Sequence, residues 1–454
     1  MQNCCFEGAG KERDTMQERK NPFAQLWAVQ KHMLKHMVIK IGVCAYWILL
    51  AIVTGLLVGA YSTLFAWVLG KAVGYRNQYS WLLFLLPLGG LLIVFLYRAA
   101  KITVDRGTNL VINSIHAKDE VPGVMAVLIF IATIITHLFS GSAGREGAAL
   151  QMGGSLGNVI ARILKKNEQE AKLLIMCGMS AAFAAVFGTP MAAAVFSMEV
   201  ISVGIMHYSA LVPCMFAALV ASRFAATMGI APETFHIQNI PALTVVTGAK
   251  MCLLALCCAG ISIFFCIFLH MVGHLYKQYL KNPYVRVFVG GLIIVGLTLL
   301  LGTRDYNGAG NELIERAISG EVVPVAFLLK MLFTALTLGA GFKGGEIVPS
   351  FCVGATFGCL FGQLVGLSPS LCAAAAMAAV FCGVTNCPIT TLLISFELFG
   401  FAGIPYFMIA ISLSYLLSGY KGLYSDQIIV YSKYRPHFIN RHVGDESEDD
   451  LIES

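Results

Sequence analysis

The chain has 454 residues, of which 57% are hydrophobic and 12% are charged, and its formal net charge is +6. Soluble domains carry about 25% charged residues, so this composition excludes an ordinary soluble protein. The apolar residues form continuous charge-free runs and do not alternate with polar residues, which argues against a transmembrane barrel. We therefore predict an all-α polytopic membrane protein.

A basic segment precedes the first long apolar run. Its cations are Lys11, Arg13, Arg19, Lys20, Lys31, Lys35 and Lys40. The positive-inside rule places this end of the chain in the cytoplasm. The run that follows, Ile41 to Gly70, is longer than the apolar core of a signal peptide, which has about 7–15 residues. We predict that residues 1–36 are a cytoplasmic N-terminal segment and that a membrane span follows it.

Further charge-free runs follow along the chain. They are Val121 to Gly144, Leu173 to Met198, Val200 to Ser222, Met251 to Tyr276 and Ile347 to Phe396. A helix crosses the bilayer with about 20 residues, so the last run must fold back more than once, whereas Gly147 to Ala161 is too short to cross. We expect tilted and broken helices in a transmembrane domain at residues 37–430, followed by an acidic cytoplasmic tail at 431–454.

The two halves of this domain repeat a signature of glycine, proline and glutamate. Glu146 and Glu346 open glycine-rich stretches 200 residues apart, and Pro190 and Pro388 each precede a glutamate by 9 residues. Matched, interrupted segments of this kind are typical of a transporter built from two repeats, here roughly 37–230 and 240–430. Spacing alone does not separate parallel from inverted repeats, and two unrelated segments that share these residues are the alternative.

Glu146 and Glu346 are predicted to lie at membrane depth. A helix that begins inside the membrane has unpaired N–H groups and a partial positive charge, which together attract anions. An ionised Glu146 would compete there with a transported anion and would withdraw when protonated, so it can gate the pathway and carry a proton. The alternatives are an ion pair with Arg145 for Glu146 and, for Glu346, a charge that only complements the helix dipole beside Lys343.

Other polar residues in the apolar runs are interpreted as structural. Glu199 and Glu397 stand where a carboxylate can end a helix or bind a neighbouring backbone amide. Snorkelling or capping of carbonyls explains Lys330 and Arg223. The cysteines lie largely inside apolar runs without metal-ligand spacing, so we expect no disulfide framework, metal site or cofactor. The composition implies no nucleic-acid partner.

The motifs together resemble one known family. Gly144-Arg145-Glu146-Gly147, the proline-to-glutamate elements and the glycine-rich segment 341–349 are similar to those of the CLC superfamily of anion channels and proton-coupled antiporters. The resemblance implies a homodimer of inverted-repeat subunits, each with its own anion pathway lined by the N-termini of broken helices. It implies that Glu146 is the gating and proton-transfer glutamate. It also makes Tyr424 the pore tyrosine, although the residues alone fit an interfacial aromatic anchor.

Departures from the family pattern indicate its fluoride branch. Ala148 stands where chloride members usually have proline, Val200 stands where chloride/proton antiporters carry a second proton glutamate, and Glu346 falls where chloride members have an apolar residue. The usual Gly-Ser-Gly-Ile-Pro element is missing, and residues 107–111 are its best counterpart. This set resembles the CLC-F fluoride/proton antiporters, which use a carboxylate at the Glu346 position. On this resemblance the pathway includes Glu146, Glu346, Tyr424, Gly144, Arg145, Gly147, Val348, Thr108 and Asn109.

The resulting prediction is a secondary active transporter, and not an enzyme, in the cell (inner) membrane. It would export cytoplasmic fluoride in exchange for protons and give fluoride resistance. Fluoride is small and strongly hydrated, so its site must replace water with strong hydrogen-bond donors. The nearest alternative is a chloride-selective CLC antiporter or channel. A remote alternative is an intramembrane hydrolase with Ser142 as nucleophile and His137 or His116 as base, and a membrane scaffold would not need matched intramembrane glutamates.

Overall fold

The computed structural model describes residues 22–102, 107–116, 121–435 and 437–444, and these are mainly helical. The chain divides into two compact units, residues 1–50 and 51–454. Helix α2 (Pro22–Gln78) begins in the first unit and continues into the second. Within the predicted terminal segments, residues 1–21, 436 and 445–454 lie outside the described residues. Seven of the described helices are long and apolar enough to cross a membrane, which agrees with the predicted polytopic class.

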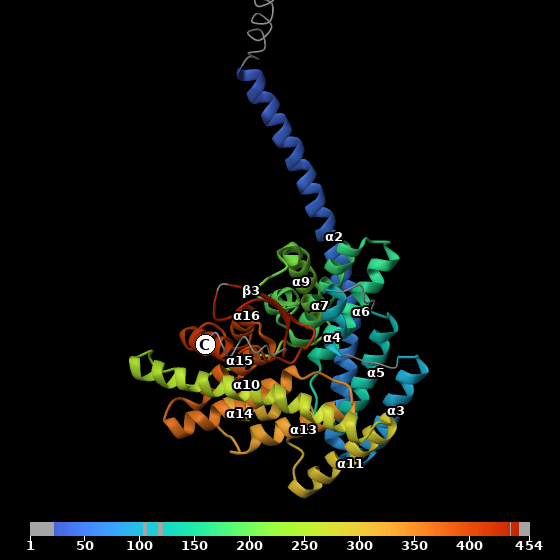
Figure 1. Ribbon diagram of the computed structural model, residues 1–454, viewed down its shortest axis with the longest axis vertical. Helices are drawn as coiled ribbons and strands as arrows, with labels where there is room; N and C mark the ends of the chain where they lie inside the picture. The colour runs from blue at the N-terminus through green and yellow to red at the C-terminus, as the bar shows by residue number, and fades with distance from the viewer. Residues whose placement is uncertain (1–21, 103–106, 117–120, 436, 445–454) are drawn as a thin grey trace, which may run out of the picture. The chain divides into compact units, whose positions relative to one another are not determined.

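The first half of the second unit is a series of helices of unequal length (Figure 1). After α2 they are η1 (Ser80–Leu85), α3 (Leu86–Ala99), α4 (Thr108–His116), α5 (Val124–Leu138), α6 (Glu146–Ile163), α7 (Glu168–Phe187), α8 (Pro190–Glu199), η2 (Tyr208–Ala210) and α9 (Leu211–Thr227). Helix α6 has 18 residues and is not among the candidate spans.

The second half repeats this pattern after the long helix α10 (Val245–Tyr279). Its further helices are α11 (Pro283–Leu301), α12 (Asn311–Ile318), α13 (Ala326–Ala340), α14 (Ile347–Val365), α15 (Pro369–Thr385), α16 (Pro388–Phe399) and α17 (Ile404–Leu417). The predicted fold-backs in the run at 347–396 fall at Gly366 and Asn386, whose φ angles are 66° and 59°. The left-handed conformation ends each helix, and a proline two or three residues later starts the next.

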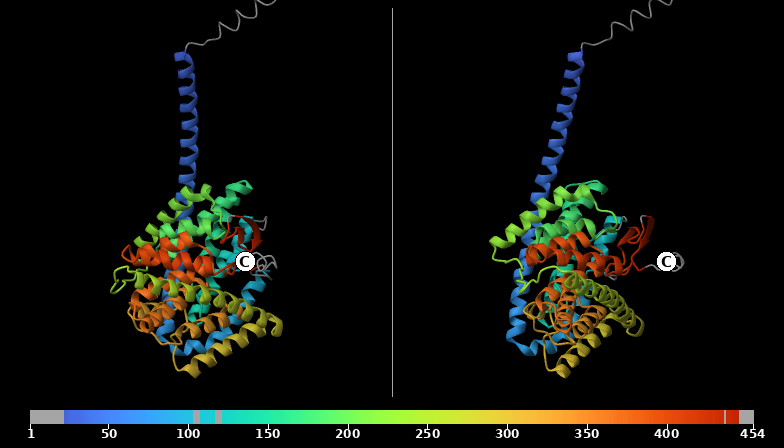
Figure 2. Two further views of the ribbon diagram at one scale, coloured as in Figure 1. Left: turned by 60° about the vertical axis from the view of Figure 1, so that its left-hand side comes forward. Right: turned by 90° about the vertical axis from the view of Figure 1, so that its left-hand side faces the viewer.

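Close contact between paired helices depends on small residues. Helix α6 packs on α7, and α14 packs on α15 in the same way. A methyl group on Gly153 would lie 2.2 Å from the Gly178 carbonyl oxygen, and one on Gly358 would lie 2.2 Å from the Cys372 carbonyl oxygen. The backbones therefore touch, as small residues allow between membrane helices. In Figure 2, α10 runs beside the orange helices of the second half, and it packs against α13, α15 and α17.

The segment after α17 contributes two strands to a small three-stranded sheet, and the second of them lies within the region predicted as a tail from residue 431 onward. Strand β2 (Ile428–Tyr431) pairs in parallel with β1 (Ser202–Val203) and antiparallel with β3 (Phe438–His442). The buried side chains of Val203, Ile429 and Val443 pack together beneath it. The sequence analysis did not predict strand β3, because the short alternating strand has little apolar signal of its own and depends on pairing with distant residues.

The contact between α6 and α7 yields a stability prediction. A methyl group on Gly178 would lie 2.1 Å from the Gly153 carbonyl oxygen, so Gly178→Ala should force the helices apart and cost about 2 kcal/mol or more. In Gly260→Ala, where nothing lies within 4 Å, the free energy of unfolding should stay level or rise by up to about 1 kcal/mol. Thermal unfolding of both variants in the same detergent is the measurement. Equal stabilities would contradict the proposed backbone contact.

Candidate functional site

The two glycine-rich stretches of the repeat meet each other directly. The Gly144 amide donates to the Gly345 carbonyl at 2.6 Å, and the Gly345 amide donates to the Gly144 carbonyl at 2.8 Å. The pair forms an isolated antiparallel bridge, so equivalent points of the two halves run in opposite directions. A methyl group on Gly345 would lie 2.5 Å from the Gly147 nitrogen, so the approach needs glycine. The bridge brings the N-termini of α6 and α14 together.

Glu146 is fully buried at the first residue of α6. Its Oε2 accepts a hydrogen bond from the Arg145 amide at 3.0 Å, and its Oε1 accepts one from Arg145 Nε at 3.3 Å. The ion pair with Arg145 that the sequence left open is therefore present. The paired carboxylate is buried at a helix N-terminus. Such an end favours a negative charge, whether it is carried by the side chain or by a bound anion.

Glu346 stands at the equivalent position, as the residue directly before α14. A methyl group on Gly147 would lie 3.5 Å from Glu346 Oε2, so the second carboxylate reaches the start of the first-half helix. The ammonium group of Lys343 lies over the Tyr97 ring, 4.8 Å from its centre. Two carboxyl groups from the two halves therefore share one small region of the protein.

Two hydroxyl groups come to the same region from other elements. A methyl group on Gly147 would also lie 3.4 Å from Oγ1 of Thr108, the first residue of α4. The Tyr424 phenol, from the segment after α17, lies within electrostatic range of Glu346 and Glu146. Both hydroxyls are buried, and neither has a hydrogen-bond partner among the described residues. The site thus offers two O–H donors and three helix N-termini beside two carboxyl groups.

The other predicted pathway residues lie around this group. Gly144 and Gly147 form its backbone, and Val348 is buried in the first turn of α14. The Arg145 guanidinium bonds Glu146 through Nε and pairs with Glu233 through Nη2. Asn109 accepts a hydrogen bond from the Asp426 amide at 3.2 Å and borders a different cavity. The sequence analysis thus placed Asn109 in one group with Gly144, Gly147 and Val348, whereas in the structure Asn109 borders a separate cavity.

Glu199 and Glu397 cap helices of the opposite half, which confirms their structural interpretation. Glu199, at the end of α8, accepts from the Ile389 and Thr390 amides at 3.0 and 2.7 Å. Glu397, in α16, accepts from the Met191 and Ala192 amides, both at 2.9 Å. Each carboxylate satisfies N–H groups that the other half's proline-started helix leaves open. These reciprocal hydrogen bonds connect α8 with α16.

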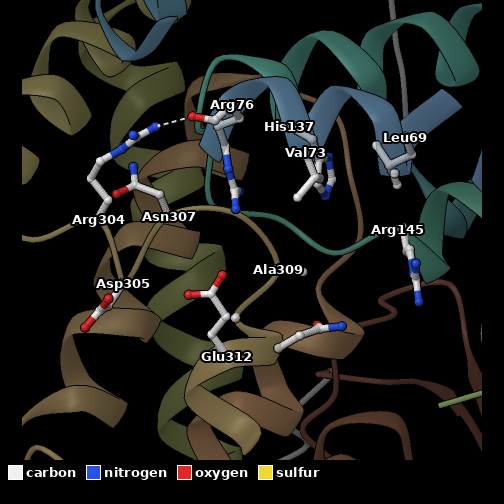
Figure 3. Close-up of a pocket in the computed structure, with 13 residues that line it drawn as sticks. Leu69, Val73, Arg76, His137, Arg145, Arg304, Asp305, Asn307, Ala309 and Glu312 are labelled. Atoms are coloured by element: carbon white, nitrogen blue, oxygen red, sulfur yellow. Dashed lines mark hydrogen bonds between the residues drawn. The ribbon is translucent and has the colours of Figure 1, made fainter. Parts of the chain in front are cut away.

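A polar cavity of about 210 Å³ lies beside Arg145 (Figure 3). Arg76 and Arg304 approach it from α2 and from the loop before α12, and the Glu312 carboxylate of α12 points toward Arg76. Arg304 holds the end of α2 through a bond from Nη2 to the Arg76 carbonyl at 3.1 Å. Sequence reasoning missed this cavity because its cations are 69 to 228 residues apart in the chain. The only signal was the polar loop at 303–312 between two apolar runs.

Buried Lys330 lies behind the loop that lines this cavity. Its ammonium donates to the Tyr306 and Gly308 carbonyls at 3.3 and 2.6 Å and to Ser142 Oγ at 3.0 Å. Capping of carbonyls, one of the predicted roles for Lys330, is thereby confirmed. The same contacts weaken the hydrolase alternative, because Ser142 Oγ bonds Lys330 and Thr334. His137 Nε2 has no partner among the described residues, so no Ser–His pair is formed with it.

The fold and this arrangement define a multi-pass membrane protein of the ion-transporting class, with carboxyl groups at the meeting point of broken helices. A family model described as voltage gated chloride channel matches residues 89–419. The chain therefore belongs to this family, the CLC family, as its motifs predicted.

Two relatives extend over most of the chain. A chloride/fluoride channel protein of Pseudomonas syringae pv. tomato is 36% identical over 402 residues, which are 86% of this chain and 88% of the relative. The crystal structure of a CLC-type fluoride/proton antiporter matches with a TM-score of 0.81 at 32% identity, and the match covers 84% of this chain and 98% of that one. These matches support the predicted inverted-repeat fold.

A more distant structure shares the fold alone. A slow cyanobacterial Cl⁻/H⁺ antiporter matches with a TM-score of 0.70 at 19% identity, covering 82% of this chain and 94% of that one. The architecture is thus common to proteins of low sequence similarity, and what is transported has to be argued from the residues of the site.

The exchanged caps generate a prediction about stability. Glu199→Ala should leave the Ile389 and Thr390 amides unpaired in the protein interior and lower the free energy of unfolding by about 3 kcal/mol. Glu168→Ala, whose side chain is 52% exposed in the first turn of α7, should cost about 0.5 kcal/mol or less. Thermal unfolding in detergent compares the two variants. A Glu199→Ala protein as stable as the control would mean that the caps do not hold α8 and α16 together.

Proposed function

We propose that this protein is a fluoride/proton antiporter that exports fluoride from the cytoplasm in exchange for protons and so gives fluoride resistance. The observation that carries the proposal is the burial of the Glu146 carboxylate on the start of α6, beside the second carboxyl group of Glu346. A transported anion and an ionised Glu146 would occupy the same helix end. Movement of one therefore depends on the charge of the other.

The donors at the site suit a small, strongly hydrated anion. Fluoride gives up its water only where short, strong hydrogen bonds replace it. The unpaired hydroxyls of Thr108 and Tyr424 and the N–H groups of the helix starts are donors of this kind. A protonated Glu346 would add one more donor. These groups support fluoride as the substrate over a larger halide, which needs less compensation for its lost water.

Protonation of Glu146 would link the two ions. The neutral carboxylic acid no longer competes for the positive helix end, so it can leave this end to fluoride. After the anion moves, loss of the proton restores the carboxylate to its place. This cycle exchanges one anion for a proton through a single group, and it is a form of secondary active transport.

A chloride-selective antiporter or channel is the second candidate. The name of the Pseudomonas syringae relative includes chloride as well as fluoride, and an H⁺/Cl⁻ exchange transporter of Vibrio cholerae is 27% identical over 272 residues. Paired fluoride and chloride efflux from liposomes, with internal pH recorded, separates the candidates. Chloride flux equal to or greater than fluoride flux would assign the protein to the chloride group.

We further propose the arrangement of the protein in the cell. The chain would lie in the cell (inner) membrane with its basic N-terminal segment in the cytoplasm, because positive charges gather on that side. It would form a homodimer with one pathway per subunit, on the basis of the family resemblance. Cross-linking in the native membrane that yields only monomers would overturn the dimer.

Glu146→Gln should abolish proton coupling. The amide keeps the size of the side chain but carries no titrating proton, so a fluoride gradient should no longer drive proton uptake into liposomes. The measurement is internal pH during fluoride efflux, with an uncoupler added at the end. Glu315→Gln, on the exposed face of α12, is the control and should couple normally. Proton uptake that persists in Glu146→Gln would remove Glu146 from the coupling role.

Glu346→Gln should impair fluoride turnover or the preference for fluoride over chloride. The substitution leaves the backbone of the α14 start in place but removes the second titratable carboxyl group beside Gly147. The glutamine amide can still donate a hydrogen bond to the anion but cannot bind or release a proton, so fluoride flux should fall by about tenfold or more. Rates with fluoride and chloride in the same vesicles provide the measurement. Unchanged flux and unchanged ion preference would reduce Glu346 to a helix-dipole charge.

A further inference from the structure

A second cavity, of about 910 Å³, lies where α10, the start of α4 and the C-terminal segment meet. It shares no lining residue with the arginine-lined cavity beside Arg145. The groups with charge or titrating protons that line it are Cys266, His270, His274 and Lys277 from α10, and Lys421 and Asp426 from the C-terminal segment. Its lining includes Val443 and Gly444, next to the tail that we place in the cytoplasm. On the proposed orientation this cavity opens to the cytoplasm.

This cavity lies close to the ion site. Gly422 and Ser425, on either side of Tyr424, belong to its lining. Cys266 is buried and lies within electrostatic range of Glu346, and the Tyr424 phenol lies within range of both. The His270 ring hydrogen-bonds the backbone of Leu423, directly before Tyr424. Cys266 therefore belongs to the lining of the cavity and is also close to the tyrosine and the second carboxyl group.

The histidines lead outward from that point along one face of α10. Cys266, His270 and His274 are spaced by four residues, so they lie above one another at intervals of about 6 Å. Intervals of this size are bridged by a single water molecule. Both histidines are exposed, whereas Cys266 is buried, so the line runs from the protein interior to water.

Histidine is suited to this place because it takes up and releases a proton near neutral pH. Lys277, Lys421 and Asp426 also face the cavity. Val200, at the end of α8, has an apolar side chain that cannot take part in such a transfer.

We propose that His270 and His274 carry protons between Glu346 and the cytoplasmic solution. The carboxyl O–H bond breaks, the proton passes through water to a ring nitrogen of His270 and then of His274, and a cytoplasmic water molecule finally receives it. Each imidazole returns to its neutral form, so no charge accumulates. This inference rests on the proposed antiport and names the route of its proton.

The test is proton and fluoride flux in liposomes containing the full-length protein. The double variant His270→Asn and His274→Asn should slow fluoride-driven proton movement by about tenfold or more at about pH 7.5, with a smaller loss at about pH 6, where buffer and water supply protons faster. Fluoride binding measured calorimetrically should be unchanged. The two single variants should fall in between, which keeps the test valid if the double variant folds poorly. His236→Asn, an exposed histidine outside the cavity, is the matched control.

The outcomes separate the two proposals. If the unaltered protein moves no protons against fluoride, the proposed antiport itself fails. If it does, and the double variant keeps its proton flux and pH profile, the relay is wrong. If fluoride and proton flux fall together by the same factor at both pH values and fluoride binding weakens, the histidines attract the anion and do not carry the proton, which also overturns the relay. Selective loss of proton flux that concentrated imidazole buffer restores supports it.

Discussion

The structure depends on one constraint, which is that a helix beginning inside a membrane must find partners for its free N–H groups within the protein. The antiparallel bridge between Gly144 and Gly345 brings two such helix starts together and uses both backbone groups of each glycine. The adjoining starts of α6 and α14 then form a region of positive potential that favours an anion. The Glu146 carboxylate, hydrogen-bonded to the Arg145 amide, supplies that charge from within the chain.

The free N–H groups at the starts of α8 and α16 also find partners within the protein. There the carboxylates of Glu199 and Glu397 bind amides of the opposite half. The surroundings of these carboxylates differ from those of Glu146. The Glu199 carboxylate accepts three hydrogen bonds from Ile389 and Thr390, which hold it in place. Structural capping and ion transport thus use the same interaction between a carboxylate and a helix end.

Much of the fold could be predicted from sequence, because bilayer thickness limits helix length and Gly366, Asn386 and the following prolines carry their own stop and start signals. The paired glutamates of the site were also found, since charge inside an apolar run is a strong signal. Two features had no such signal. The arginine-lined cavity joins residues as distant as Arg76 and Arg304, and β3 exists only through pairing with β2. Both depend on tertiary contacts that periodicity does not record.

The ion pair around Arg145 explains how Glu146 could change its charge without disrupting the site. The Arg145 guanidinium binds both Glu146 and Glu233, and Glu233 in turn accepts a bond from Asn311 at 3.0 Å. A buried cation left without a partner is costly. Because Glu233 stays in place when Glu146 is neutralised, the cation keeps one carboxylate at every stage. In the proposed cycle, Glu233 would thereby separate the stability of this region from the charge of Glu146.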